Sequence, residues 1–234
     1  MTIKYPQISI IIPVLNEEDY IKKVLLNIKN NAASNQIKEL LVIDGGSEDA
    51  TIKTALNEGA RVISTAKGRA LQMNTGAAIA SGDILYFLHV DTLPPKDFDL
   101  EILNAYAEGF KVGCFRMKFD SSHPFLSIFT WCTRINTPLC RGGDQSLFIL
   151  KSLFEKANGF DESYKIYEDN EFIRRVYKMT PFKVLKNTVT TSSRRYDKKG
   201  ILTLQWHFGI IHLKHFFGAG PDHLHKYYVK HIAL

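Results

Sequence analysis

Residues 8–14, with the sequence ISIIIPV, decide the fold of this chain. The run is short, apolar and rich in β-branched residues, which predicts a strand buried on both faces, as in a parallel sheet covered by helices. Similar runs follow in the first half of the chain, namely ELLVID at 39–44, ARVIST at 60–65 and DILYFLHVD at 83–91. Strands that alternate with longer segments in this way predict an α/β protein.

The segments between the strands carry helical patterns. Ile21, Val24, Leu25 and Ile28 are spaced i, i+3, i+4 and i+7, which predicts one apolar helix face. The further elements that we expect are helices at 68–80, at 96–107, from Lys151 and at 168–178, and strands at 112–119 and 146–150. Residues 1–200 are therefore predicted to form one Rossmann-like domain with a mainly parallel central sheet flanked by helices.

Composition and cysteine usage are those of an ordinary globular protein. The 234 residues are 45% hydrophobic and 23% charged, which is typical of folded domains. Cys114, Cys132 and Cys140 are odd in number and lack metal-ligand spacing, so we expect buried free thiols. The N-terminal run has no cleavage-site pattern and no segment is long enough to span a bilayer, so we expect a cytoplasmic protein, soluble or peripheral at the inner face of the membrane.

The net charge of +6 lies in the last part of the chain. Residues 186–234 hold eight Lys or Arg against Asp197 and Asp222, whereas the first 185 residues hold 22 charges of each sign. Within this tail, aromatic residues such as Trp206 alternate with His and Lys, which predicts an amphipathic helix. We expect a helical extension at 201–234 that packs on the domain or contacts an anionic membrane surface, and no nucleic-acid partner. The oligomeric state stays open.

Polar residues follow three predicted strands where each strand ends. Ligands of an open parallel sheet bind beyond the carboxyl ends of its strands, so these residues predict a shared site, although each alone could cap a helix. Basic and amide residues also begin the helix at 68–80, where free N–H groups favour anions. The residues expected to contact a ligand at this site, including two from the basic tail, are Pro13, Asn16, Glu17, Asp44, Gly45, Arg69, Gln72, Asn74, His89, Arg194 and Arg195.

The motifs resemble those of family 2 glycosyltransferases with the GT-A fold. P-x-x-N-E at 13–17, D-G-G-S-x-D-x-T at 44–51 and the acidic motif at Asp91 carry the resemblance. The segments KGRALQMNTGA, FLHVDT, GGDQSLFI, EDNEFIRR and TSSRRYDKKG are similar to a small bacterial subset associated with radical-SAM and selenodomain genes, sometimes tied to arsenosugar biosynthesis. The resemblance implies an inverting transfer of a sugar from a nucleotide diphosphate, expected to be UDP, to a hydroxyl of a small or lipid-linked acceptor.

Asp91 is the expected metal ligand, because a carboxylate can hold a hard divalent cation that neutralises a leaving diphosphate. Mn²⁺ or Mg²⁺ is the expected cofactor. The first Asp of the family's D-x-D motif is His89 here, and we expect this imidazole to bond the ribose instead of the metal. Arg194 and Arg195 are expected on a mobile loop that closes on the diphosphate, with a solvated charge run as the alternative.

The resemblance also implies a general base at the start of the helix at 168–178. Asp169 is the first choice and Glu168 is the second, while the alternative is that both only complement the helix dipole. Three residues that precede this helix are expected on the acceptor side, namely Gly143, Asp144 and Gln145.

Two other function classes remain for such a sheet. A nucleotidyltransferase would carry a glycine-rich basic loop after the first strand, whereas this chain has Asn16 and Glu17 there. A nucleotide-sugar binding protein without catalysis would not need both Asp91 and Asp169.

Overall fold

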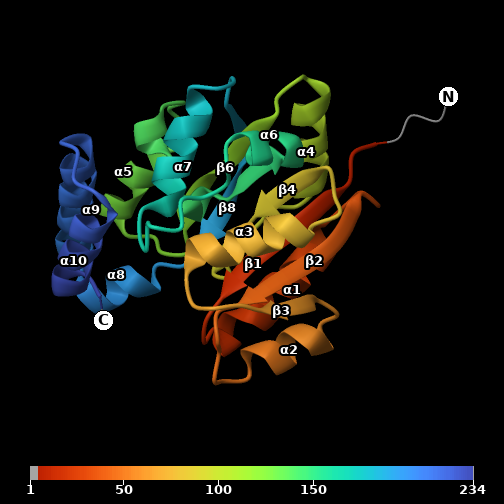
Figure 1. Ribbon diagram of the computed structural model, residues 1–234, viewed down its shortest axis with the longest axis horizontal. Coiled ribbons are helices and arrows are strands. Elements are labelled where there is room, and N and C mark those ends of the chain that lie inside the picture. The colour runs from red at the N-terminus through yellow and green to blue at the C-terminus, as the bar shows by residue number, and fades with distance from the viewer. Residues whose placement is uncertain (1–4, 234) are drawn as a thin grey trace.

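The computed structural model describes residues 5–233 and has one eight-stranded sheet at its centre, with the strand order β3-β2-β1-β4-β7-β6-β8-β5 (Figure 1). The strands are β1 (Ile8–Val14), β2 (Ile37–Asp44), β3 (Arg61–Ser64), β4 (Ile84–Phe87), β5 (Thr92–Leu93), β6 (Val112–Phe119), β7 (Leu147–Leu150) and β8 (Lys183–Thr191). The β3-β2-β1-β4 half is parallel, as is the β6–β8 pair. Strand β7 is antiparallel to β4 and β6, and β5 to β8, so the sheet is mixed but mostly parallel.

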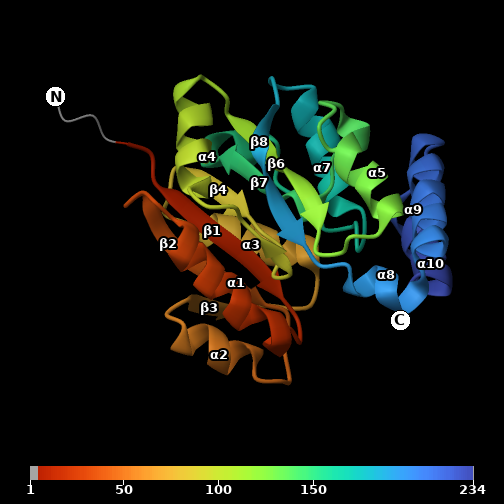
Figure 2. The ribbon, with the colours of Figure 1, turned by 180° about the vertical axis from the view of Figure 1, so that it is seen from behind.

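Helices cover both faces of the sheet (Figures 1 and 2). One face carries α1 (Glu18–Asn31), α2 (Thr51–Asn57) and α4 (Phe98–Ala107), and the other carries α3 (Arg69–Ile79), α6 (Lys151–Lys156) and α7 (Glu168–Tyr177). The remaining helices are α5 (Pro124–Cys132), α8 (Arg194–Lys199), α9 (Ile201–Phe216) and α10 (Pro221–His231), with two 3-10 turns at Pro138–Cys140 and Gly143–Gln145.

The two-sided cover explains why β1 is apolar throughout. Ile10 and Ile12 pack toward α1, whereas Ile11 packs toward α3, and all three are fully buried. Helix α3 approaches the strand so closely that a Cβ on Gly76 would lie 2.5 Å from Cγ2 of Ile11. A glycine is therefore required at this helix position.

Several local predictions were wrong in detail. The strand predicted at 83–91 ends at Phe87, because the chain leaves the sheet and the Thr92 N–H bonds the carbonyl of His89 in a turn. Strand β8 was not predicted, since Lys and Asn interrupt its apolar pattern. The loop predicted for Arg194 and Arg195 is the start of a helix. Of the three free cysteines, only Cys114 is buried.

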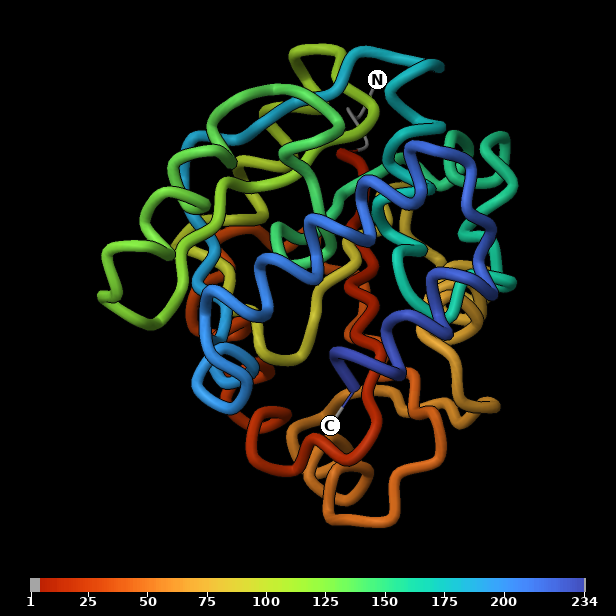
Figure 3. The backbone as a smooth tube through the Cα atoms, turned by 90° about the vertical axis from the view of Figure 1, so that its left-hand side faces the viewer, coloured from red at the N-terminus to blue at the C-terminus, as the bar shows by residue number. Residues whose placement is uncertain are grey.

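Helices α9 and α10 lie together across one side of the molecule (Figure 3). Their inner residues Leu204, Ile211 and Leu224, with Ile232 directly after α10, belong to the same apolar cluster as β1 and α1. The tail therefore packs on the domain, as one of the two sequence-based alternatives proposed. Within residues 5–233, we find no helix with the length and apolar character that crossing a membrane requires.

A polar contact also fastens α9 to α7. The Tyr167 hydroxyl lies 2.7 Å from Nδ1 of His212. Burial, followed by the nearby Arg174 and His215, lowers the pKa of His212 from 6.5 to about 4. The folded protein consequently holds this imidazole neutral.

Acidification should weaken this attachment. Because the folded pKa of His212 is below its unfolded value, its contribution to stability is complete above about pH 6.5 and is lost as pH falls toward about 4. The free energy of unfolding of the wild type should therefore drop by about 1–2 kcal/mol more than that of His212→Gln between about pH 7.5 and pH 5. Parallel urea titrations of both proteins measure the difference, and identical pH dependence would contradict the prediction.

Candidate active site

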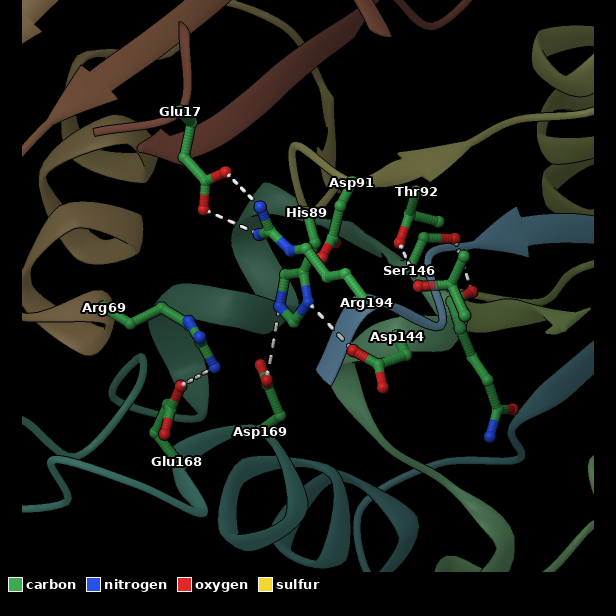
Figure 4. A network of polar contacts seen from close by, with 12 residues as sticks. Glu17, Arg69, His89, Asp91, Thr92, Asp144, Ser146, Glu168, Asp169 and Arg194 are labelled. Carbon is green, nitrogen blue, oxygen red and sulfur yellow. Dashed lines mark hydrogen bonds and ion pairs between the residues drawn. The ribbon is translucent and has the colours of Figure 1, made fainter. Parts of the chain in front are cut away.

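The carboxyl ends of β1, β2 and β4 meet at one edge of the sheet, because these strands are parallel neighbours. Asp44 is the last residue of β2, while Glu17 and Asp91 follow β1 and β4. Ion pairs join this edge to the first turns of α7 and α8, and a further ion pair joins the start of α3 to that of α7 (Figure 4). Most of the residues predicted for the site are thereby brought together.

Arg194 bridges two of these carboxylates. Its Nη1 and Nη2 atoms lie 2.8 Å from the two carboxylate oxygens of Glu17, and Nη2 lies 3.2 Å from Oδ2 of Asp91. The guanidinium also lies over the Tyr20 ring, 4.2 Å from its centroid. Arg194 is thus held at the sheet edge by α8, 177 residues after its main partner.

His89 connects two further carboxylates. Its Nδ1 lies 3.3 Å from Oδ1 of Asp144 and its Nε2 lies 3.5 Å from Oδ2 of Asp169. Burial by itself lowers the pKa of His89, but the hydrogen bonds to Asp144 and Asp169 outweigh burial and raise the pKa to about 10. The imidazole is therefore a cation at neutral pH and lies between two carboxyl groups.

Gly143 makes this arrangement possible. A Cβ at position 143 would overlap Oδ2 of Asp169 and lie 2.6 Å from Cε1 of His89. The adjacent Gly142 has no such neighbour, since a Cβ there would meet nothing within 4 Å. Glycine at position 143 therefore serves to admit the Asp169 carboxylate next to the imidazole.

Glu168 and Arg69 form a third charge pair. Nη1 of Arg69 lies 3.2 Å from Oε1 of Glu168, whose side chain is 2% exposed. Oε2 of Glu168 is buried without a hydrogen-bond partner. Burial raises the pKa of Glu168, and Arg69 offsets this only in part. This geometry makes Glu168 the structural partner of Arg69.

Several predicted ligand contacts are instead used within the protein. Nε2 of Gln72 donates to the carbonyls of Val14 and Ile43, at 2.8 and 2.7 Å, and so holds the ends of β1 and β2 together. Gly45 leaves room for this amide, because a Cβ there would lie 3.1 Å from Nε2 of Gln72. Asn74 bonds both the N–H and the carbonyl of Phe160, away from the sheet edge. The predicted contact between Asn74 and a nucleotide ligand is therefore not supported.

The turn residues have similar roles. Asp44 is 1% exposed and accepts the N–H groups of Gly46 and Ser47. The Asn16 side chain accepts the N–H of Glu48, so both residues order the loops that follow β1 and β2. These contacts order the loops but do not cap a helix, because neither α1 nor α2 has a side-chain hydrogen bond at its N-cap. Pro13, the next-to-last residue of β1, lies on the wall of the site.

Two hollows open at this edge and share Pro13, Glu17 and Arg69 in their walls. The inner one, of about 120 Å³, is lined by His89, Asp91, Asp144 and the arginines 194 and 195, and the outer one has about 650 Å³. Ligand pockets for small molecules and cofactors commonly measure about 300–1,000 Å³. The outer hollow has room for a nucleoside, and the inner one presents the charges for a phosphate group.

Residues from the tail that were not predicted complete the site. Leu204 and Phe208 of α9 line the inner hollow, together with Tyr196 of α8. Arg195 also lines it, and its Nη2 lies 2.7 Å from the Tyr228 hydroxyl of α10. The tail is therefore a wall of the site, which a pattern of apolar spacing alone does not reveal.

Arg141 is another residue that the sequence did not single out. It is 3% exposed, and its Nη1 and Nη2 donate to Oε1 of Gln145 at 2.6 Å and to the carbonyl of Thr133 at 2.7 Å. Gln145 is itself buried and bonds the carbonyl of Cys140, so it holds the turn and does not face an acceptor. In the sequence, the one signal for Arg141 is its position directly before the GGDQ segment at 142–145.

The fold and the charged sheet edge define a nucleotide-type binding site in an α/β protein. Residues 9–152 match the family described as Glycosyl transferase family 2. This match covers more than half of the chain, so the protein belongs to glycosyl transferase family 2.

Curated relatives are similar over parts of their length. The probable glycosyltransferase YdaM of Bacillus subtilis is 27% identical, across 74% of this chain and 47% of the relative. The glucosyl-3-phosphoglycerate synthase of Mycobacterium tuberculosis is 36% identical, across 38% of this chain and 30% of the synthase. The chain thus spans about half or less of the length of these relatives.

Solved structures share the fold. The mannosyltransferase PcManGT from Pyrobaculum calidifontis, in complex with GDP-Man and Mn²⁺, has a TM-score of 0.63 at 18% identity, with 80% of this chain and 57% of that chain covered. S. aureus TarS in complex with UDP-GlcNAc has a TM-score of 0.63 at 17% identity, with 80% and 58% covered. At such identities the likeness shows the GT-A-like fold alone, which confirms the predicted fold class.

Gly143→Ala should strain the site. The added methyl group must displace Asp169 or His89, so we expect the free energy of unfolding to fall by about 1–3 kcal/mol. Gly142→Ala is the matched control, because its Cβ points into open space. Chemical denaturation of both variants provides the measurement, and equal stabilities would show that position 143 tolerates a side chain.

Proposed function

We propose that the protein is an inverting glycosyltransferase that moves a sugar from a nucleotide diphosphate, UDP in the first instance, to a hydroxyl acceptor. The observation that carries this proposal is the inner hollow, where Asp91 and three arginines line one cavity at the carboxyl end of β4. Residues 1–200 would form the catalytic domain, and residues 201–234 would be the helical extension that walls it.

The charged groups divide the reaction between them. Asp169 accepts the proton of the acceptor hydroxyl, whose oxygen attacks the anomeric carbon while the bond from that carbon to the diphosphate oxygen breaks. A single displacement of this kind inverts the anomeric configuration. The electron pair leaves with the diphosphate, and Arg69, Arg194 and Arg195 stabilise its added negative charge.

Asp91 fits the divalent cation that the fold family implies. Its side chain is 16% exposed, lines the inner hollow and already contacts a cation, Arg194. No three His, Cys, Asp or Glu side chains among residues 5–233 form a metal-binding group. One or two carboxylates completed by substrate phosphates suit Mg²⁺ or Mn²⁺. Such an ion, when bound, neutralises charge on the diphosphate.

The narrower assignments remain proposals. UDP is supported by the likeness in fold to TarS, which was solved with UDP-GlcNAc, whereas PcManGT was solved with GDP-Man. The subset associated with radical-SAM and selenodomain genes rests on the sequence motifs. Thermal-shift titrations with UDP, GDP and their sugars in the presence of Mn²⁺ will identify the base, because a ligand stabilises the state that binds it.

Asp169→Asn should remove the general base. We expect turnover to fall by about 10³-fold while the UDP-induced thermal shift stays close to that of the wild type, because the base acts on the acceptor. Asp19→Asn is the control, since Asp19 occupies the first turn of α1 as Asp169 occupies that of α7. Normal turnover in Asp169→Asn together with loss in Glu168→Gln would transfer the role to Glu168.

We further propose that the outer face of α9 contacts an anionic membrane surface, where a lipid-linked acceptor would lie. Leu202, Trp206, Leu213 and Phe216 follow each other at helical spacing and are 58–72% exposed. Helix α5, on the same side of the molecule in Figure 1, exposes Trp131. Exposed aromatic residues beside an excess of Lys and Arg are typical of interfacial helices. The basic tail complements anionic lipid headgroups.

Trp206→Ser combined with Phe216→Ser should weaken membrane binding by at least about 10-fold, because each large apolar side chain contributes about 1.5–3 kcal/mol on burial. Sedimentation with vesicles of phosphatidylcholine and phosphatidylglycerol measures the binding. Leu56→Ser is the control, since Leu56 is 55% exposed on the distant α2. A wild-type protein that does not bind these vesicles would contradict the proposal.

A further inference from the structure

Two carboxylates converge on one cation at the sheet edge. Glu17 follows β1 and Asp91 follows β4, its parallel neighbour, so the backbone places both acids at the same edge. Nη2 of Arg194 lies within 3.2 Å of an oxygen from each of them. Two anions held this close repel each other unless a positive charge lies between them. The backbone therefore forms a cation site, and Arg194 fills it.

The site has the character of a metal site as much as of an ion pair. The Glu17 and Asp91 side chains are 17% and 16% exposed, and both line the inner hollow. His89 stands where the D-x-D motif has its first carboxylate, but both of its ring nitrogens face the carboxylates of Asp144 and Asp169. Glu17 shares Nη2 of Arg194 with Asp91 and is therefore the carboxylate placed to assist it.

We propose that Glu17 and Asp91 together form the divalent-cation site of this protein, and that the Arg194 guanidinium occupies this site until a donor diphosphate binds. The proposal rests on the proposed function and adds to it a second metal ligand and an internal competitor. The divalent ion replaces the guanidinium, because Mg²⁺ needs oxygen atoms at about 2.0–2.1 Å and cannot share that space with an arginine.

The diphosphate makes this exchange favourable in two ways. It supplies phosphate oxygens that complete the coordination of the ion, for which two carboxylates are too few. It also offers Arg194 a new anionic partner, since a guanidinium fork binds phosphate oxygens bidentately. Metal affinity and nucleotide affinity are consequently coupled, and each must raise the other by the same factor.

Mn²⁺ binding without nucleotide tests the competition directly. Isothermal titration and the electron paramagnetic resonance signal of free Mn²⁺ report binding without any need for turnover. We expect weak binding to the wild type and about 10-fold tighter binding to Arg194→Gln, which removes the competing cation. Lys198→Gln, on the exposed side of the same helix, removes an equal charge and should bind like the wild type.

Arg194→Lys covers the case in which Arg194→Gln fails to fold. A lysine keeps the charge but has one ammonium group in place of the fork, so Mn²⁺ should bind more tightly than to the wild type and more weakly than to Arg194→Gln. Unchanged Mn²⁺ affinity in the folded variants would overturn the proposal.

Glu17→Gln tests the second ligand. In the Arg194→Gln background, it should abolish the gain in Mn²⁺ affinity, as Asp91→Asn should. With UDP present, the Glu17→Gln single variant should bind Mn²⁺ about 10-fold more weakly than the wild type does. Retention of wild-type affinity would remove Glu17 from the metal site. Failure of the proposed function would be separate, because it would leave the Mn²⁺ titrations without nucleotide intact but show no sugar transfer.

Discussion

The parallel pairing of β1 with β2 on one side and β4 on the other brings Glu17, Asp44 and Asp91 to one edge of the sheet. The carbonyls at the ends of parallel neighbouring strands lie close together. The Gln72 side chain donates hydrogen bonds to two of them, those of Val14 and Ile43. Buried carbonyls need such donors. The loops that carry the charges therefore begin from a fixed base, and the positions of Glu17 and Asp91 follow from it.

Around this base, positive and negative groups alternate. Arg69 contacts Glu168, His89 lies between Asp144 and Asp169, and Arg194 lies between Glu17 and Asp91. Each acid is thereby held in place before a ligand arrives, which reduces the reorganisation that binding and catalysis require. An incoming diphosphate adds negative charge, and the arginines are the groups that can turn toward it.

Apolar spacing predicted the fold well, because it reflects burial of neighbouring residues. The ends of β1 and β2 were predicted to the residue, whereas β4 ends four residues before the predicted strand does. Apolar spacing could not predict the ion pair between Arg194 and Glu17, because 177 residues separate the two in the sequence. Similarly, Asn74 follows Gln72 by two residues and so points elsewhere on α3, and nothing in the sequence shows that it bonds Phe160.

Gly200 is the single residue between α8 and α9, and it has a φ of +81°, which favours glycine. Helix α8, which carries Arg194, is consequently followed at once by α9, whose outward face is apolar. The outward face of α9 is exposed to the surroundings of the protein, while α8 places Arg194 on the carboxylates of Glu17 and Asp91. Only Gly200 therefore separates the helix that presents the apolar surface from the helix that positions the guanidinium.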